Sequence, residues 1–293
     1  MNKNIKIEIT ENLSGKTVKE ILFNEMNLSV ATVRHLKNIP GSIKLNNEHV
    51  RVTKEVSCKD IIEINIDDEN SVNIVPENIT LDILYEDDDI IALNKPRNMP
   101  THPSHNHHND TLANGLMYYF KENFTFRAIT RLDRDTSGVV LVAKNRFSAQ
   151  ILGNDIKNKK IRKKYIALIN GTPEEETGII NAPIKRTKEG IILRCVGFDG
   201  KEAITEYKVL KKSNNFSLVE LIPVTGKTHQ LRVHMSYIGT PIYGDDLYGA
   251  PQNGENIRLH CEEISFKHPF EDKIITIKAK IPDDIKEFID SNF

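Results

Sequence analysis

Residues 127–145 read RAITRLDRDTSGVVLVAKN, and this stretch places the carboxylate of Asp133 between arginines just before an apolar run. The run at 139–143 is short, continuous and rich in β-branched residues, which is typical of a strand covered on both faces. Gly138 marks its start. A carboxylate held by arginines at the mouth of such a strand stays ionised at neutral pH. In an enzyme, Asp133 would be the nucleophile, whereas an isolated Arg-Leu-Asp favours a solvated charged turn.

The overall composition indicates a folded protein without global attraction to polyanions. The 293 residues are 39% hydrophobic, which supports a real core in one large domain with an appendage, or in two domains. Lysine and arginine total 40 against 41 aspartates and glutamates. Any nucleic-acid surface must therefore arise from local clustering of basic side chains.

Cysteine usage and the absence of long apolar runs suggest a reducing compartment. Cys58, Cys195 and Cys261 are far apart and lack the paired spacings of zinc sites or disulfide frameworks, so we expect reduced core thiols. Residues 1–9 lack the apolar run of a signal peptide, and no stretch approaches the ~20 apolar residues that span a bilayer. We expect a cytoplasmic monomer that does not enter a membrane.

An N-terminal module is expected over residues 1–75. Its pattern predicts two short helices and four strand-like pieces, at 17–26 and 29–38 for the helices and at 5–9, 42–47, 49–52 and 61–66 for the strands. Ser29 is a plausible N-cap of the second helix. An acidic, proline-containing linker follows at 67–78, so a second domain is expected over 76–293.

The second domain is expected to mix strands with a few helices. The patterns predict two strands around an acidic turn, then helices, a meander of short strands, a helix after a glycine and a final helix, at 83–96, 111–122, 147–157, 178–222, 225–235 and from Asp283. Asp110 is the expected cap of the helix at 111–122.

The loop at 97–110 contains four histidines, His102, His105, His107 and His108, which raises a metal hypothesis. Adjacent histidines on a loop rarely converge, and no further cysteine or acidic ligand is expected nearby. Polar loop residues are the favoured interpretation, and no metal site is predicted.

The strongest local positive patch has six basic residues in eight positions, namely Lys157, Lys159, Lys160, Arg162, Lys163 and Lys164. Tyr165 follows directly and opens a strand-like run. Basic residues ahead of an aromatic ring suit a phosphate backbone with a base stacked at its end. A solvated strand edge protected by lysines is the alternative.

Several motifs, in this order along the chain, are similar to those of the RluA/RluD family of RNA pseudouridine synthases. They are NKP at 94–96 with MPTHP at 99–103, RLDRDTSG at 131–138, KYIA at 164–167, GKTHQLRVH at 226–234, PIYGD at 241–245 and LH at 259–260. The resemblance implies an α+β fold, in which a mixed, largely antiparallel β-sheet with flanking helices forms a central active-site cleft.

The resemblance also implies roles for individual residues. Asp133 would be the essential nucleophile or base, Arg232 would pair with it, and Tyr165 would stack on the extruded uracil and exchange a proton at C5. Arg131 would occupy the position that the uridine leaves, although a structural salt bridge is its alternative. No cofactor or metal is required, because the isomerisation involves no net redox change and loses no group.

The resemblance extends to the contacts with RNA. Residues 28–34 and 43–50 resemble the α-L RNA-binding module named for a small-subunit ribosomal protein, with Asn47 at its turn glycine. The expected RNA-binding side chains are those of the basic patch together with Arg131, Lys95, Lys227, Arg34, Lys37 and Lys44. The expected partner is RNA rather than DNA, and 23S ribosomal RNA rather than transfer RNA.

Three residues depart from the family pattern. Thr130 stands where histidine usually precedes Arg-Leu-Asp, Asn98 replaces the glycine of Lys-Pro-x-Gly, and Lys227 replaces arginine after Gly226. Lys227 keeps its charge but loses the planar fork that binds phosphate through two hydrogen bonds.

Two other functions remain as alternatives. One is a catalytically silent RNA- or ribosome-binding protein, which the retention of Asp133, Tyr165 and Arg232 disfavours. The other is an aspartate-nucleophile glycosidase, which needs a second acid across the site. Asp135 is too near in sequence to be assumed for that role.

Overall fold

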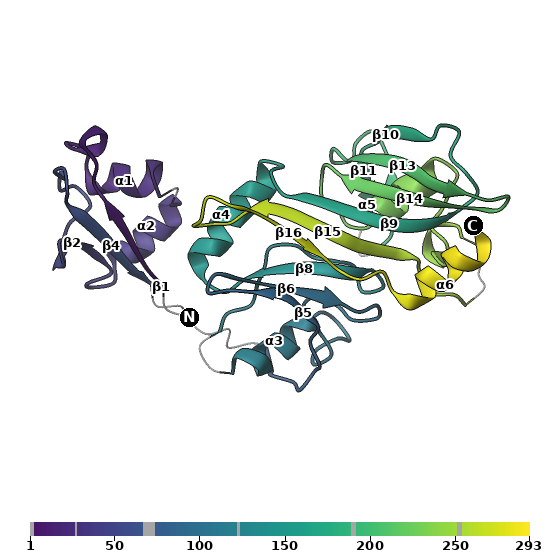
Figure 1. The fold of residues 1–293 in the computed structure, drawn as a ribbon, viewed down its shortest axis with the longest axis horizontal. Helices are drawn as coiled ribbons and strands as arrows, with labels where there is room; N and C mark the ends of the chain where they lie inside the picture. The colour runs from purple at the N-terminus through teal and green to yellow at the C-terminus, as the bar shows by residue number, and fades with distance from the viewer. Residues whose placement is uncertain (1–2, 27, 67–73, 122–123, 189–191, 251–253) are drawn as a thin grey trace.

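The computed structural model describes residues 3–26, 28–66, 74–121, 124–188, 192–250 and 254–293. Figure 1 shows a small N-terminal unit at one end of a long sheet, with helices packed along that sheet. The fold is α+β, as predicted, with a large mixed sheet. No described helix is long and apolar enough to cross a membrane.

The N-terminal unit is a four-stranded antiparallel sheet with two helices. Its strand order is β1-β4-β2-β3, where β1 is Lys3–Glu8, β2 is Ile43–Leu45, β3 is Glu48–His49 and β4 is Ile61–Ile66. Helices α1 (Val18–Asn24) and α2 (Val30–Lys37) follow a 3-10 turn at Glu11–Leu13. Ser29 caps α2 as predicted, and Asn47 adopts the left-handed conformation at φ 72°. The expected linker falls largely at 67–73, outside the described residues.

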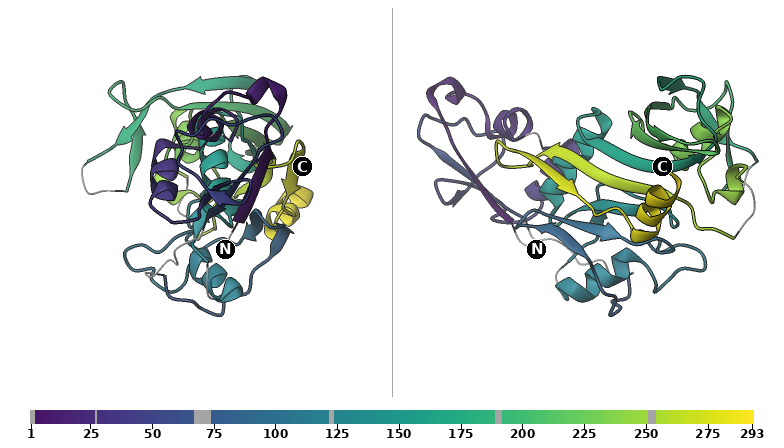
Figure 2. Two further views of the ribbon diagram at one scale, coloured as in Figure 1. Left: turned by 90° about the vertical axis from the view of Figure 1, so that its left-hand side faces the viewer. Right: turned by 45° about the vertical axis from the view of Figure 1, so that its right-hand side comes forward.

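Two aromatic side chains from the rest of the chain complete the hydrophobic core of the N-terminal unit. Phe147 is buried within that core, and Phe270 packs against it. Thr32 on α2 donates a hydrogen bond to Gln150 on the helix that carries Phe147. Figure 2 shows the backbone of the N-terminal unit and of the rest of the chain from two further sides. The unit therefore lies against the rest of the protein rather than apart from it.

The large sheet has ten strands, and its main path runs β10-β13-β14-β9-β15-β8-β6-β5. The strands are β5 (Ile83–Glu86), β6 (Ile90–Lys95), β7 (Arg127–Ala128), β8 (Ser137–Ala143), β9 (Arg162–Asn170), β10 (Thr177–Asn181), β13 (Ile204–Lys212), β14 (Phe216–Pro223), β15 (Leu259–Lys267) and β16 (Ile274–Lys278). Its pairs are antiparallel except for β15 with β8. All seven residues of β8 are buried, as its sequence predicts.

The flanking helices are α3 (Leu112–Phe120), α4 (Arg146–Lys157), α5 (Gln230–Tyr237) and α6 (Asp283–Asn292), and a small β11 (Ile184–Arg186) and β12 (Arg194–Val196) pair forms a separate hairpin. Two local predictions are wrong. Thr111 rather than Asp110 caps α3, because its hydroxyl forms a capping box with Asn114, while Asp110 pairs with His107. Helix α5 begins at Gln230, because His229 takes the left-handed conformation just before it.

Gly138 brings strands β8 and β15 unusually close. Its φ is +114°, and a Cβ at this position would lie 2.2 Å from the carbonyl oxygen of Cys261. Only glycine fits there. This close approach lies at the start of β8, directly after the turn that contains Asp133. Of the three cysteines expected in the core, Cys261 is buried, Cys195 is half-buried and Cys58 is exposed.

Candidate active site

A cavity of about 440 Å³ opens where β8 and β9 begin, facing the segment before α5. Its lining brings together side chains from motifs that are far apart in sequence, among them Arg131, Asp133, Lys163, Tyr165, Lys227, His229 and Arg232. The remaining lining residues include Ile129, Thr130, Leu132, Thr136 and Leu259. The cavity therefore gathers the three predicted catalytic residues.

Asp133 lies half-buried on a turn that the backbone holds firmly. Thr136 N donates to the carbonyl oxygen of Asp133 (3.2 Å). The hydroxyl of Thr101 donates to the carbonyl oxygen of Leu132 (3.0 Å) and accepts a hydrogen bond from Leu132 N (3.3 Å). Among the residues that the structure describes, no side chain donates a hydrogen bond to the Asp133 carboxylate. The carboxylate is thus positioned through its backbone and left available to the cavity.

Lys95 is buried beneath the same turn and stabilises it through hydrogen bonds. Its ammonium, fully buried, donates to the carbonyl oxygens of Pro96 (2.8 Å), Met99 (2.7 Å) and Arg134 (3.1 Å). Burial lowers the pKa of Lys95 to about 7, and the carboxylates of Asp133 and Asp135 oppose that shift. The prediction that Lys95 contacts RNA does not agree with this position. A lysine directly before a proline gives no sequence signal of burial, and its three carbonyl partners appear only in the fold.

The loop that Lys95 secures also explains one departure from the family pattern. Asn98 adopts φ 61°, in the left-handed region that glycine enters freely and asparagine tolerates. The loop therefore keeps the backbone shape that a glycine allows. Thr130, the second departure, is buried, and its hydroxyl accepts a hydrogen bond from Leu141 N (2.9 Å). It supports the wall of the cavity.

Tyr165 lies buried on β9, opposite Cys261 on β15. Burial raises the pKa of Tyr165 well above its ordinary value, and the neighbouring thiol and Asp133 add to the effect. The phenol therefore remains protonated at neutral pH. Its ring lines the cavity near Asp133, where a planar base would find an aromatic surface.

Arg232 pairs with a different carboxylate from the predicted one. Its Nε donates to Asp245 Oδ2 (2.8 Å) and its Nη2 to Asp245 Oδ1 (2.7 Å), and both side chains are buried. No ion pair joins Arg232 to Asp133, so the predicted direct pair is wrong for this structure. Burial lowers the pKa of Arg232, but Asp245 raises it more, so that the pKa lies above its ordinary value. The charge of Asp133 makes a smaller contribution to this rise.

Three residues that support Arg232 were not assigned a role from the sequence. Asp245 accepts hydrogen bonds from Nε and Nη2 of Arg232, and the centroid of the Tyr248 ring lies 5.0 Å from the guanidinium carbon. The Tyr248 hydroxyl lies 2.7 Å from Nδ1 of His229, and burial lowers the pKa of that imidazole although Asp133 opposes the shift. The motif PIYGD at 241–245 contains Asp245, and its acidic residue could have suggested a partner for an arginine.

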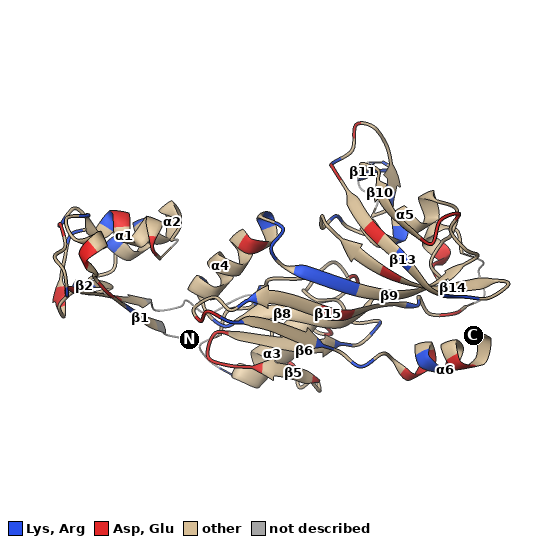
Figure 3. Cartoon of the chain, turned by 45° about the horizontal axis from the view of Figure 1, so that its top comes forward, with Lys and Arg blue, Asp and Glu red and all other residues tan. Residues whose placement is uncertain are grey.

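The basic patch divides between the surface and the cavity. Figure 3 shows its positive charge around the end of α4 and the start of β9. Lys159 and Lys160 pair with Glu202 and Asp155, and Lys164 pairs with Glu262 on the face away from Tyr165. Lys163 alone in the patch lines the cavity, while Lys157 and Arg162 are exposed. The patch is therefore less continuous than its sequence suggests.

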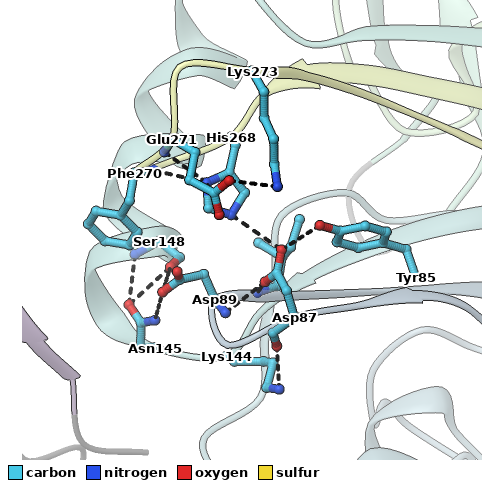
Figure 4. A network of polar contacts seen from close by, with 11 residues as sticks. Tyr85, Asp87, Asp89, Lys144, Asn145, Ser148, His268, Phe270, Glu271 and Lys273 are labelled. Carbon is cyan, nitrogen blue, oxygen red and sulfur yellow. Dashed lines mark hydrogen bonds and ion pairs between the residues drawn. The ribbon is translucent and has the colours of Figure 1, made fainter.

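A second polar cluster lies at the far end of the sheet, and Figure 4 shows it from close by. Asp87, Asp89 and His268 place their ligand atoms within 4.8 Å of one another. His268 Nδ1 accepts hydrogen bonds from the backbone of Phe270 (3.3 Å) and Glu271 (2.9 Å), so the neutral ring carries its proton on Nε2, toward Asp87. That nitrogen is then a donor and does not suit a metal ion.

The chain is similar to several known proteins. Residues 89–237 match the family model of RNA pseudouridylate synthase. The uncharacterized RNA pseudouridine synthase YjbO of Bacillus subtilis (strain 168) is 36% identical over 278 residues, covering 93% of this chain and 98% of that protein. Ribosomal large subunit pseudouridine synthase D of Borreliella burgdorferi is 39% identical over 243 residues, covering 78% of this chain and 74% of that protein.

A solved structure shows the same fold. Human RNA Pseudouridylate Synthase Domain Containing 4 superposes with a TM-score of 0.59 at 25% identity, covering 71% of this chain and 92% of that one. The fold and the cavity define an isomerase that acts on RNA. The chain belongs to the RNA pseudouridine synthase family.

Proposed function

We propose that this protein converts specific uridines of large-subunit ribosomal RNA to pseudouridine, with Asp133 as the catalytic carboxylate. The observation that carries the proposal is the cavity that Asp133 lines together with Tyr165, Arg131 and Arg232. Relatives named ribosomal large subunit pseudouridine synthase D favour ribosomal RNA over transfer RNA as the target.

The proposed chemistry needs one carboxylate and no cofactor. The N1–C1′ bond breaks, the base turns, C5 bonds to C1′, the C5 proton leaves and N1 gains a proton. Breaking a glycosidic bond builds positive charge on the sugar, which a nearby carboxylate stabilises or captures. Because the phenol of Tyr165 has a raised pKa, we assign it to stacking and assign removal of the C5 proton to Asp133 or water.

Arg232 would act by orienting the site rather than by pairing directly with Asp133. Its guanidinium is fixed by Asp245 and Tyr248, and it places a buried positive charge near the catalytic carboxylate. A fixed cation lowers the cost of keeping Asp133 ionised in a cavity that closes over RNA. Arg232 is therefore a positioning residue in this proposal.

RNA would reach the cavity across the basic surface at the end of α4. Extruding a uridine costs a few kcal/mol, and a loop or bulge in the RNA reduces that cost. Exposed Arg131 would occupy the position that the uridine leaves, and Lys227 together with exposed Lys157 and Arg162 would contact phosphates.

We assign residues 1–75 to an RNA-binding module and 76–293 to the catalytic domain. In the module, Arg34 and Lys37 are exposed on α2, and Lys44 is half-buried on β2. These cations would add affinity for structured RNA without entering the cavity. Replacing Arg34 and Lys37 by methionine is expected to weaken RNA binding several-fold and to leave the rate at saturating RNA unchanged.

The deciding experiment incubates purified protein with total RNA from a strain in which the gene is deleted, and then maps pseudouridines. One or a few sites in large-subunit ribosomal RNA are expected to return with wild-type protein and not with Asp133→Asn. No restored site with wild-type protein, or restored sites with Asp133→Asn, would contradict the proposal. Release of free uracil would indicate a glycosidase instead, and RNA binding without any product would indicate a silent binding protein.

A further inference from the structure

Lys163 is the basic residue of the patch that enters the cavity. It lies on β9 two positions before Tyr165, so both side chains project from the same face of the sheet. Its side chain is half-buried, and its Nζ would lie 3.8 Å from a Cβ placed on Gly226. The neighbouring Lys164 projects from the opposite face, where Glu262 (3.0 Å) and Glu220 (3.8 Å) neutralise it.

Lys163 has no such neutralising partner. Among the residues that the structure describes, no ion pair joins its ammonium to a carboxylate. Burial lowers its pKa, and the Cys261 thiol opposes the shift. Keeping an unpaired cation in a cavity costs free energy, so such a group is expected where a ligand supplies the missing negative charge.

The proposed reaction creates negative charge on the detached uracil, in the cavity that Lys163 lines. When the N1–C1′ bond breaks heterolytically, its electron pair stays on the uracil ring and spreads over N1, O2 and O4. The ring must stay bound while it turns, and then a pair on C5 forms the new bond to C1′. A cation in the plane of a base stacked on Tyr165 would stabilise that anion most while it is detached.

We propose that Lys163 is a further catalytic residue, whose ammonium donates a hydrogen bond to a carbonyl oxygen of the detached uracil and stabilises its negative charge. Lys163 transfers no proton in this step; the C5 proton leaves to Asp133 or water, and N1 is protonated from solvent. The inference rests on the proposed function, because it concerns the same bond cleavage.

The test measures single-turnover release of tritium from RNA that carries [5-³H]uridine at a mapped target site. Lys163→Met is expected to lower the rate constant on the order of 100-fold while the Kd for RNA changes less than about threefold. Lys163→Arg is expected to recover at least about tenfold of that loss, since it restores the charge. Lys286→Met, the same change on exposed α6, is the matched control and is expected to match wild type.

A second measurement separates catalysis from a structural role. With 5-fluorouridine at the target, the detached base is a weaker base and needs less stabilisation. The C5–C1′ bond can form but no C5 proton can leave, so the readout is the fluorine-retaining C5-glycosyl product, separated from the substrate by chromatography. The penalty of Lys163→Met in the formation of this product is expected to shrink about tenfold. An equal penalty with both substrates would overturn the inference. If Lys163→Met does not fold, Lys163→Gln takes its place in both measurements.

The outcomes also distinguish this inference from the proposed function. Active wild-type protein with Lys163→Met within about threefold of its rate would refute the role of Lys163 and leave Asp133 in place. Wild-type protein that makes no pseudouridine would refute both. A loss explained wholly by a higher Kd would assign Lys163 to binding and overturn the catalytic role.

Discussion

The cavity at Asp133 and the polar cluster around Asp87 contain similar charged side chains. Within the described residues, the protein supplies hydrogen-bond partners for the carboxylate of the cluster, but not for the carboxylate of the cavity. In the cluster, Asp87 accepts hydrogen bonds from the Tyr85 hydroxyl (2.7 Å) and from the backbone of Asp89 (2.8 Å) and Ile90 (2.9 Å). Burial opposes the effect, but these donors hold the pKa of Asp87 below its ordinary value. In the cavity, the described residues donate no side-chain hydrogen bond to Asp133 and no carboxylate pairs with Lys163.

This difference separates stability from function. A carboxylate whose partners are all supplied by the protein contributes to folding and has no capacity left for a ligand. A carboxylate held only through its backbone costs stability and keeps its charge for a substrate. The fold places the first kind where hairpin β15–β16 meets the turn before β6 and the second kind where β8 and β9 begin.

The largest expected effect follows the change Asp133→Asn. This near-isosteric change should lower the rate of pseudouridine formation on the order of 10⁴-fold, the scale seen when a catalytic carboxylate or nucleophile is removed. It breaks no side-chain hydrogen bond, so the free energy of unfolding should change by less than about 1 kcal/mol. Single-turnover assays and urea unfolding measure the two quantities. Retained activity would assign the chemistry to another residue.

The buried Arg232–Asp245 pair borders the cavity but is fully paired, so it should behave like the cluster in stability. Arg232→Met leaves Asp245 as an uncompensated buried charge and should cost about 3–5 kcal/mol of unfolding free energy. The double change Arg232→Met with Asp245→Leu should recover part of this loss. Urea unfolding tests both, and a single-variant loss below about 1 kcal/mol would show that the pair carries little of the stability.

The buried imidazole of His260 should make the free energy of unfolding depend on pH. It is buried between strands, 2.9 Å from Ser137 Oγ, and burial lowers its pKa from 6.5 to about 4. Between these values the unfolded chain binds more protons, so the stability that a neutral His260 provides is present above pH 6.5 and is lost as pH falls toward 4. The loss should amount to about 2–3 kcal/mol.

The control for that pH dependence is His260→Gln, which cannot titrate. All other titrating groups contribute equally to both proteins. The unfolding free energy of the variant should therefore fall less than that of wild type between pH 6.5 and 4. Parallel pH profiles for the two proteins would refute the assignment.

Replacing Asp89 in the polar cluster around Asp87 should change the stability of the protein but not its activity. Its carboxylate accepts a hydrogen bond from Asn145 (2.8 Å), the residue that caps α4. Asp89→Ala leaves that buried amide donor without its acceptor and should lower the free energy of unfolding by about 1–3 kcal/mol. At a temperature where the variant is folded, its rate of pseudouridine formation should equal that of wild type. Thermal melts and activity at two temperatures measure the effect, and a rate lost at the permissive temperature would contradict it.

The smallest effects are expected on the exposed surface. Lys157→Met and Arg162→Met each remove one cation that would contact phosphate. Each should weaken RNA binding a few-fold and reduce the slope of log affinity against log salt by about 1. Titrations at several salt concentrations measure this slope. An unchanged slope would place these side chains outside the RNA interface.

The sequence predicted several local elements well, because long motifs and strong periodicity fix local structure. The buried strand at 139–143, the cap Ser29 and the left-handed Asn47 all agree with the structure. Partners across the fold were harder to predict. Arg232 pairs with Asp245 because a turn thirteen residues later returns to it. The motif that contains Asp245 suggests an arginine partner but does not show which arginine the turn meets.

Burial of charged groups was the other limit. A lysine in a basic patch or before a proline reads as exposed, because lysines are usually solvated. Lys95 and Lys163 enter the interior only because the strands that carry them pack against the turn of Asp133 and the segment at Gly226. The distinction between a paired and an unpaired cation requires the assembled sheet.

The most direct test measures two quantities, the rate of pseudouridine formation and the free energy of unfolding, in Asp133→Asn and Asp89→Ala side by side. Asp133→Asn is expected to lose the rate and keep the stability, and Asp89→Ala is expected to lose stability and keep the rate. An active Asp133→Asn protein, or an Asp89→Ala protein that is stable but inactive, would contradict the assignment of the open cavity to catalysis.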